Sequence, residues 1–335
     1  MTEYATRTTQ YVSRITQRGS RQLVADVALL GVTAIWGATF VMVRDAVASF
    51  PVFSFMTLRF VFAALVLLPF VYLRQRRRGA EERRSEGAEG RPFPLALPLS
   101  HSPTLLRSSA PLLIGIALFT GYAFQTAGLH LTTPAKAGFI TGLSVVIVPV
   151  VAALWLRQAP ERNAWLGVGL AMAGLALLSL QNGLSIAPGD LLVFCCALAF
   201  AAHILLTGRF APRFDPVLLT FWQIVVVLLL SGIAALLFDV RSSGGLTSLL
   251  AGLNGQVLFA AAFTGLFATS LAFGVQTVAQ RFTSSTHTAL VFAAEPVFAA
   301  LFSFLLIGEV LGPRQVLGCG LILAGMIVAE VRQGG

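Results

Sequence analysis

The chain has 335 residues, of which 56% are hydrophobic and 11% are charged. Soluble domains carry about 25% charged residues, so this composition excludes a soluble globular protein and indicates a chain with many membrane spans. The net charge of +9 comes from arginines that cluster in loops beside apolar segments, a placement typical of contact with lipid headgroups and not of nucleic-acid binding.

Apolar segments of the length that crosses a bilayer as a helix, about 20 residues, follow one another along the chain. They are continuous and do not alternate as the strands of an outer-membrane barrel do. We therefore predict an all-α polytopic membrane protein. Its ten transmembrane helices are expected at residues 23–43, 53–73, 110–130, 136–156, 164–181, 189–208, 216–238, 256–279, 285–307 and 314–332.

Arginine is distributed unevenly over the segments that join these predicted spans. Residues 1–22 and the long connection 74–109 hold most of it, and the loops of the opposite face hold few cations. Because cytoplasmic loops carry the excess of Arg and Lys, we expect both termini in the cytoplasm. Residues 1–22 are then a cytoplasmic tail. Residues 74–109 are expected to form a mobile cytoplasmic loop, either a solvated linker or a partner-binding segment, because they contain too few apolar residues to pack.

The sequence repeats itself at an offset of 151 residues, which aligns residues 120–174 with 271–325 without a gap. The alignment pairs Gln125-Thr126 with Gln276-Thr277, Thr132 with Thr283, Lys136 with His287, and the LGxGL motif at 166–170 with that at 317–321. More loosely, Asp26 matches Asp190. Five spans per repeat place the two halves in opposite membrane orientations, as in many secondary transporters. We expect these repeats at 23–181 and 189–332.

One predicted span, 285–307, carries a carboxylate near its middle, at Glu295, and a proline directly after it. A charge at the bilayer midplane costs a few kcal/mol, so Glu295 needs a partner, a water-filled cavity or a proton. Pro296 removes one helix hydrogen bond and leaves a carbonyl free to face a cavity. Glu295 is therefore our first candidate for function, as a proton carrier, as a partner of a substrate amine, or as a structural cap of a broken helix.

Further polar or aromatic side chains lie within the predicted spans or at their ends, and we take them as candidates for a substrate pathway: Arg59, Trp36, Tyr122, Gln125, Lys136, His203, Gln223, Gln276 and His287. Each also has a structural interpretation. The amides hydrogen-bond between helices, and the aromatic rings pack. His203 either titrates near neutral pH or packs in the interior. Arg59 either snorkels, pairs with a carboxylate or binds a substrate anion. Lys136 and His287 either bind an anionic substrate or anchor span ends in the interface.

Several of these residues belong to motifs of a known family. Trp36-Gly37-Ala38-Thr39-Phe40, Pro51 and Leu58-Arg59-Phe60 resemble the opening of an EamA domain, and Glu295-Pro296-Val297, Gly308-Glu309 and Leu317-Gly318 resemble the close of its second copy. Over nearly everything except 1–22 and 74–109, the chain is similar to the drug/metabolite transporter superfamily. The resemblance implies two inverted five-helix EamA repeats, a cavity lined by the first four helices of each, and a solute carrier that is often an exporter. The first repeat has Ser144-Val145 where the second has Glu295-Pro296, so the halves differ chemically.

Together these features lead us to expect a secondary transporter that moves a small organic solute across the cytoplasmic (inner) membrane by alternating access. The family resemblance, and no single residue, implies export of an amino acid or a related metabolite. Glu295 either couples transport to protons or orients the substrate. The alternatives are a channel and a translocator of lipids or hydrophobic compounds. No paired acid and base, nucleophile motif, P-loop or metal-spaced Cys/His set indicates an enzyme, a pump, a cofactor or a bound metal. The sign of the substrate's charge stays open, because Arg59 and Lys136 favour anions whereas Glu295 favours cations or zwitterions.

Overall fold

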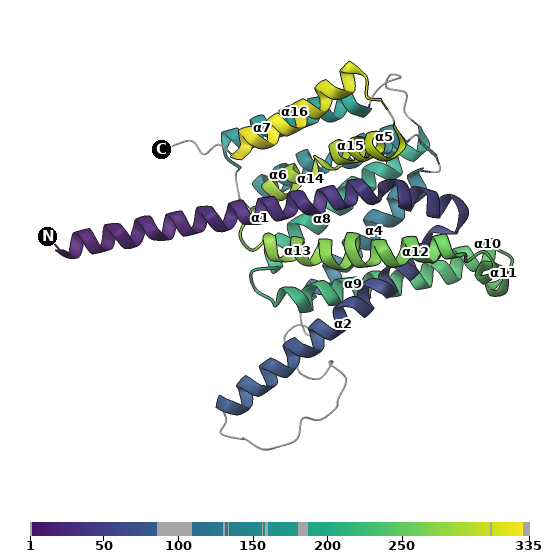
Figure 1. The fold of residues 1–335 in the computed structure, drawn as a ribbon, viewed down its shortest axis with the longest axis horizontal. Coiled ribbons are helices and arrows are strands. Elements are labelled where there is room, and N and C mark those ends of the chain that lie inside the picture. The colour runs from purple at the N-terminus through teal and green to yellow at the C-terminus, as the bar shows by residue number, and fades with distance from the viewer. Residues whose placement is uncertain are drawn as a thin grey trace. The chain divides into compact units, whose positions relative to one another are not determined.

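A computed structural model describes residues 2–85, 109–129, 131–132, 134–155, 157, 160–179, 187–308 and 310–330. Within these ranges all regular secondary structure is helical, which confirms the all-α prediction (Figure 1). The elements are α1 (Thr2–Ser49), α2 (Val52–Ser85), α4 (Ala110–Leu129), α5 (Pro134–Gly142), α6 (Ser144–Leu154), α7 (Arg162–Ser179), α8 (Pro188–Phe210), α9 (Pro216–Ala234), the π-helix η1 (Ala235–Asp239), α10 (Val240–Ser242), α11 (Leu246–Ala251), α12 (Gly255–Phe263), the π-helix η2 (Thr264–Leu271), α13 (Ala272–Ala279), α14 (Ser285–Phe292), α15 (Glu295–Ile307) and α16 (Pro313–Glu330).

Eight stretches in the described part of the chain are long and apolar enough to cross a membrane, and they coincide with eight of the ten predicted spans. They are Ser20–Thr39, Val52–Arg77, Ala110–Gly128, Lys136–Leu154, Pro188–Phe210, Pro216–Ser242, Gly255–Ala279 and Ser285–Leu305. The other two predicted spans, 164–181 and 314–332, correspond to α7 and α16, which have 18 residues each. Both helices begin with polar residues, which shortens their apolar parts. The count of ten spans therefore stays a prediction.

Two helices extend beyond the apolar segments that predicted them. α2 continues to Ser85, so the first part of the expected loop 74–109 is helical. Residues 74–85 are rich in Arg, Glu, Gln and Ala, which have high helix propensity, and this explains the extension. The remainder of that loop, 86–108, lies outside the described residues. Similarly, the expected tail is helical from Thr2 and continues directly into the first span as α1.

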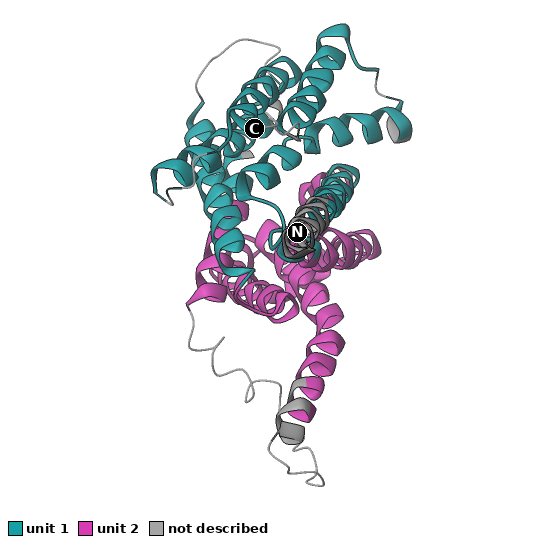
Figure 2. Ribbon diagram, turned by 90° about the vertical axis from the view of Figure 1, so that its left-hand side faces the viewer, with its two compact units in different colours: residues 1–40, 124–212, 275–335 teal, residues 41–123, 213–274 magenta. Residues whose placement is uncertain are grey.

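The helices gather into two compact units, and each unit takes segments from both halves of the chain (Figure 2). Unit 1 comprises residues 1–40, 124–212 and 275–335, and unit 2 comprises 41–123 and 213–274. The chain passes from unit 2 to unit 1 after Ala123 and again after Gly274, two positions that differ by 151 residues. This difference equals the offset of the sequence repeat. The compact units are thus distinct from the sequence repeats, but their boundaries follow the repeat register.

Within unit 1, α7 and α16 pack through glycines that occupy equivalent places in the two repeats. A Cβ atom added to Gly167 would lie 2.5 Å from the carbonyl oxygen of Gly325, and one added to Gly174 would lie 2.5 Å from that of Gly318. Residue numbers rise along one helix as they fall along its partner, so the pair is antiparallel. Small residues permit this close backbone approach in membranes. Antiparallel packing of equivalent helices is the geometry that two inverted repeats require.

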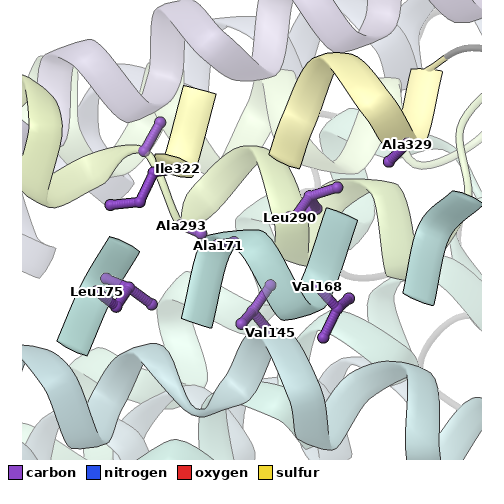
Figure 3. Packing of buried hydrophobic residues seen from close by; sticks show 9 residues of the cluster. Val145, Val168, Ala171, Leu175, Leu290, Ala293, Ile322 and Ala329 are labelled. Carbon is purple, nitrogen blue, oxygen red and sulfur yellow. The ribbon is translucent and has the colours of Figure 1, made fainter. Parts of the chain in front are cut away.

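The apolar core of unit 1 surrounds this helix pair and includes residues of α6 and α14 (Figure 3). Leu175 of α7 and Ile322 of α16 are fully buried in it. Val145 of α6 belongs to the same cluster, as do Ala293 and Ala294, which join α14 to α15. The core of unit 1 therefore holds the points at which two predicted spans, 136–156 and 285–307, are interrupted.

In unit 2, α2 and α9 are joined near both of their ends by polar contacts. The Asp239 carboxylate of η1 accepts hydrogen bonds from the backbone N–H and the hydroxyl of Ser54, at 2.6 and 2.8 Å, in the first turn of α2. Asp215 caps the N-terminus of α9 and lies 3.8 Å from Nε of Arg74 in α2. Helix N-termini favour such carboxylates because their N–H groups lack partners within the helix.

Candidate functional site

The predicted span 285–307 is interrupted next to Glu295, which is the first residue of α15. Between α14 and α15 the N–H groups of Ala293 and Ala294 each donate to the carbonyl three residues earlier, at 3.2 and 3.1 Å. Such bonds are tighter than those of an α-helix. Glu295 therefore lies at the start of a new helix, where the positive end of the helix dipole favours a carboxylate.

The first repeat is interrupted at the equivalent place. Its span divides into α5 and α6 at Leu143, whose N–H donates to the carbonyl of Ile140 at 3.1 Å. Ser144 then occupies the position of Glu295, and Val145 that of Pro296. The first repeat makes this interruption without a proline at that position, so the interruption beside Glu295 does not depend on Pro296 alone. The two repeats share the backbone geometry and differ in the side chains that it presents.

Around Glu295, polar side chains from three other helices of unit 1 form what we call the Glu295 cluster. Cys196 of α8 is buried, and its thiol lies within the electrostatic influence of the Glu295 carboxylate. The Cys196 sulfur is 3.8 Å from the hydroxyl of Thr141 in α5, and Gln125 of α4 donates to that hydroxyl at 3.5 Å. Glu295 itself is half-buried. Two long contacts therefore link the amide, the hydroxyl and the thiol, and the Glu295 carboxylate acts on that thiol electrostatically.

Trp36 approaches the same interruption from α1. Its ring lies 4.9 Å from that of Phe292, the last residue of α14, in an edge-to-face arrangement. Directly after it, Gly37 packs so closely on α15 that an added Cβ would lie 2.7 Å from the backbone nitrogen of Ala299. The close helix approach that Gly37 suggests is therefore present, and Trp36 is placed beside the Glu295 segment.

Lys136 lies in a second polar group of unit 1, the Asp190 cluster. Its ammonium is 3.9 Å from the Asp190 carboxylate, which also accepts hydrogen bonds from the Thr132 hydroxyl and, at 2.7 Å, from the N–H of Ala187. Asp190 thereby satisfies the N-terminal turn of α8 and ties it to the start of α5. The sequence repeat paired Lys136 with His287, which is half-buried, and Asp190 with Asp26, which is buried in α1.

In unit 2, Arg59 is surrounded by neutral groups, and we call this set the Arg59 cluster. Nε donates to the Thr269 hydroxyl at 2.7 Å, and Nη2 donates to the Ala268 carbonyl at 3.2 Å and to the Tyr122 hydroxyl at 3.4 Å. The Tyr122 ring also faces the guanidinium, with its centroid 5.4 Å from Cζ. Phe60 stacks edge-on against Tyr122.

The position of Arg59 excludes two of the interpretations drawn from the sequence. It lies seven residues after Val52, which is about 10 Å along α2 at 1.5 Å per residue, and only 6% of the residue is exposed. The side chain therefore does not snorkel to the membrane surface. None of its described partners is a carboxylate, so it does not form an ion pair within the described residues.

The remaining candidates are buried side chains of the helix interiors. Gln276 donates to Gln280 at 3.1 Å, and Gln280 in turn donates to the Ile204 carbonyl at 3.0 Å, which links α13 to α8. His203 of α8 is 3% exposed, and Gln223 of α9 is fully buried. The structure thus groups Gln125 with Glu295 and Tyr122 with Arg59, and it places the other candidates in separate contacts.

Sequence reasoning missed Thr141 and Thr269, which contact the candidates Gln125 and Arg59, and Cys196, which contacts Thr141. Thr and Cys are common on transmembrane helices, and nothing in their local pattern separates a packing hydroxyl or thiol from one beside a charge. Thr269 is identified only by the contact of η2 with α2. Asp190, which pairs with Lys136, is different, because its match to Asp26 in the repeat was visible in the sequence and could have marked it as a candidate.

Comparison with known proteins supplies the family. The model of the EamA-like transporter family matches this chain twice, at residues 23–180 and 187–330. The chain belongs to the EamA-like transporter family. An uncharacterized transporter of Archaeoglobus fulgidus is 33% identical to it over 96% of this chain and 92% of that protein. YyaM of Bacillus subtilis, also an uncharacterized transporter, is 25% identical over 91% of this chain and 92% of its own.

More distant similarities agree with this assignment. YedA of Escherichia coli K12, an uncharacterized inner membrane transporter, is 23% identical over 91% of this chain and 90% of its own. One crystal structure, 19% identical, superposes with a TM-score of 0.68 over 91% of this chain and 98% of that one. At that identity it shows a shared fold alone. This EamA protein is thus a multi-pass membrane transporter, which implies a small-molecule substrate and a lipid bilayer around it.

Proposed function

We propose that this EamA transporter is a secondary carrier that moves a small organic solute across the cytoplasmic membrane by alternating access. An amino acid or a related metabolite is the proposed solute, and export is the proposed direction, as the family resemblance implies. Both termini are proposed to be cytoplasmic, since Arg is concentrated in the tail and in the connection 74–109. Ten spans in two inverted repeats complete the proposed topology.

The observation that carries this proposal is the position of Glu295. It combines an ionisable side chain within a membrane span, an interrupted helix at a repeat-equivalent position, and polar neighbours on three other helices. Secondary transporters place substrate and ion sites at interrupted helices of this kind, near the membrane midplane. An intramembrane carboxylate is costly unless it serves such a site.

Counterflow in proteoliposomes tests the proposal. Vesicles holding purified full-length protein are loaded with one candidate solute at high concentration, and the uptake of labelled solute from outside is followed. A carrier gives uptake that saturates and depends on the internal solute, because each turnover returns a loaded site. A channel or a lipid translocator gives neither property, and that result would contradict the proposal.

The role of Glu295 is tested in the same vesicles. Glu295→Gln retains the shape of the side chain and removes its charge, and we expect it to alter the rate of exchange or its dependence on pH. Glu161→Gln makes the same chemical change at an exposed position at the start of α7 and is the matched control. An unchanged rate and pH profile in Glu295→Gln would remove Glu295 from the mechanism.

A further inference from the structure

Among the described side chains of unit 2, no carboxylate balances the positive charge of Arg59. Three carboxylates occur among the described side chains of this unit, and each is engaged elsewhere: Asp45 with Arg44 at 3.1 Å, Asp215 with Arg74 at 3.8 Å, and Asp239 with Ser54. Arg59 is bonded to a hydroxyl, a carbonyl and a phenol. An arginine inside a membrane protein normally pairs with an acidic group or faces a water-filled cavity.

Arginine cannot remove this cost by losing its proton, because a guanidinium stays protonated in proteins. A buried lysine, histidine or carboxylate can become neutral, whereas a guanidinium keeps its charge. Its charge is therefore balanced either by distant groups or by an anion from outside the chain. The hydrogen-bond geometry of the cluster distinguishes these two cases.

The three hydrogen bonds of Arg59 use Nε and Nη2 and leave one nitrogen available. Nη1 carries two N–H donors, and among the described residues none accepts from it. The Tyr122 ring lies 5.4 Å from Cζ, and the two Nη1 donors lie in the plane of the guanidinium. A planar acceptor such as a carboxylate fits donors arranged in this way.

The surrounding backbone holds the guanidinium in one orientation. In an α-helix the N–H of Ala272 would bond to the carbonyl of Ala268, but in the π-helix η2 it bonds to Phe267 and Thr269 instead. The Ala268 carbonyl lies in this π-helical segment and accepts a hydrogen bond from Arg59. Such π-helical turns are frequent at functional sites.

Two further contacts prevent the cluster from shifting. The Thr269 hydroxyl donates its own proton to the Thr264 carbonyl at 3.0 Å, so its oxygen is fixed as an acceptor for Nε. A Cβ atom on Gly265 would lie 2.6 Å from the carbonyl oxygen of Arg59, so η2 and α2 meet backbone to backbone at this residue. Nη1 is therefore preorganised, which lowers the entropic cost of binding a ligand.

We propose that Nη1 of Arg59 binds the carboxylate of the transported solute, so that the solute is an organic acid or an amino acid. This inference rests on the proposed carrier function. A monoanionic carboxylate neutralises the single charge of the cluster, whereas a phosphate dianion would leave a net negative charge within the span. The charge of the Arg59 cluster therefore favours a carboxylate over a phosphate.

The test measures the melting temperature of the purified full-length protein at constant ionic strength, in chloride and with added probes. The probes are formate, acetate, benzoate and the common L-amino acids, each beside its carboxamide, together with inorganic phosphate. A ligand that binds the folded state alone raises the melting temperature. We expect at least one carboxylate to raise it, its carboxamide not to, and the shift to vanish in Arg59→Gln.

Three results would overturn the proposal: no shift with any carboxylate, an equal shift with the carboxamide, or a shift that survives in Arg59→Gln. A larger shift with phosphate than with every carboxylate would overturn the assigned ligand class. If Arg59→Gln does not fold, Thr269→Val keeps the charge and removes the acceptor for Nε. We expect it to weaken carboxylate binding roughly tenfold, the effect of one hydrogen bond to a charged group, and unchanged binding would contradict the proposal.

Counterflow separates the failure of this inference from the failure of the carrier function. A solute without a carboxylate that exchanges with saturation, and whose exchange is unchanged in Arg59→Gln, would overturn the anion site and leave the carrier function intact. Carboxylates that bind through Arg59 but never exchange would overturn the carrier function and leave the anion site intact.

Discussion

The Glu295 cluster of unit 1 and the Arg59 cluster of unit 2 each place a charged side chain within a membrane span, but they differ in the burial of that side chain and in the length of its cluster's contacts. Glu295 is half-buried, and its cluster is linked by contacts of 3.5 and 3.8 Å. Arg59 is 6% exposed and is held by a bond of 2.7 Å and two longer ones to groups that are themselves fixed. The shortest contact of the Arg59 cluster is therefore shorter than either contact given for the Glu295 cluster.

The two charges also differ in chemistry. A carboxylate can become neutral by binding a proton, whereas a guanidinium stays charged. A group that changes its charge within a loosely bonded setting suits coupling, because it differs between two states of a transport cycle. A permanent charge in a rigid setting suits recognition of one feature of the solute. We therefore propose that Glu295 of unit 1 serves coupling and that Arg59 of unit 2 serves recognition, and each of the following variants tests that division.

The largest expected effect concerns the pH dependence of exchange. In Glu295→Gln we expect the counterflow rate to fall by at least about tenfold, which corresponds to about 1.4 kcal/mol in the barrier, and to become independent of pH. Arg59→Lys keeps the charge in unit 2, so its remaining exchange should follow the wild-type pH profile. A pH profile that changes in Arg59→Lys and not in Glu295→Gln would reverse the division.

The next effect is on stability and concerns the short bond in unit 2. Thr269→Val keeps the shape of the side chain and removes the acceptor for a buried charged donor, which should lower the free energy of unfolding by about 1.5–3 kcal/mol. Thermal unfolding in detergent measures it. A loss below about 0.5 kcal/mol would show that the Arg59 cluster is not rigidly held.

A slightly smaller effect is expected from the backbone contact beneath Arg59. Gly265→Ala places a methyl group against the carbonyl oxygen of Arg59 and should destabilise the protein by about 1–3 kcal/mol. Gly274→Ala lies in the same span with no atom within 4 Å of the added Cβ, and it is the matched control. Alanine is the better helix former, so the control should be neutral or slightly stabilised. Equal melting temperatures for the two variants would contradict close packing of η2 on α2.

The sequence was sufficient for the helices and for the repeat, since both depend on signals that are local or periodic. The apolar segments of the sequence predicted the positions of the eight spans found in the described residues. The offset of 151 residues also relates the two interrupted helices, at Leu143 and Ala294. The charge within each cluster was visible as well, because Arg59 and Glu295 stand out in apolar surroundings.

The sequence did not reveal which helices contact one another, and the remaining errors follow from that. The hydrogen-bond partners of Arg59 lie in η2, and propensity scales do not predict that this segment is π-helical. Pro296 appeared to explain an interruption that the first repeat makes without a proline. The division into units 1 and 2 arises from packing between segments distant in the chain, so a pattern read along the chain could not show it.

The smallest expected effect is on the stability of the Glu295 cluster, whose contacts are the longer ones. Thr141→Val removes the hydroxyl that joins Gln125 to Cys196 in the Glu295 cluster, and it is the same chemical change as Thr269→Val. Because its two contacts are long and involve neutral partners, the free energy of unfolding should fall by less than about 1 kcal/mol. Thermal unfolding of both variants, side by side, gives the difference between the clusters directly. A loss in Thr141→Val as large as that in Thr269→Val would mean that the two clusters are equally rigid, and the assignment of coupling to Glu295 would then lose its structural basis.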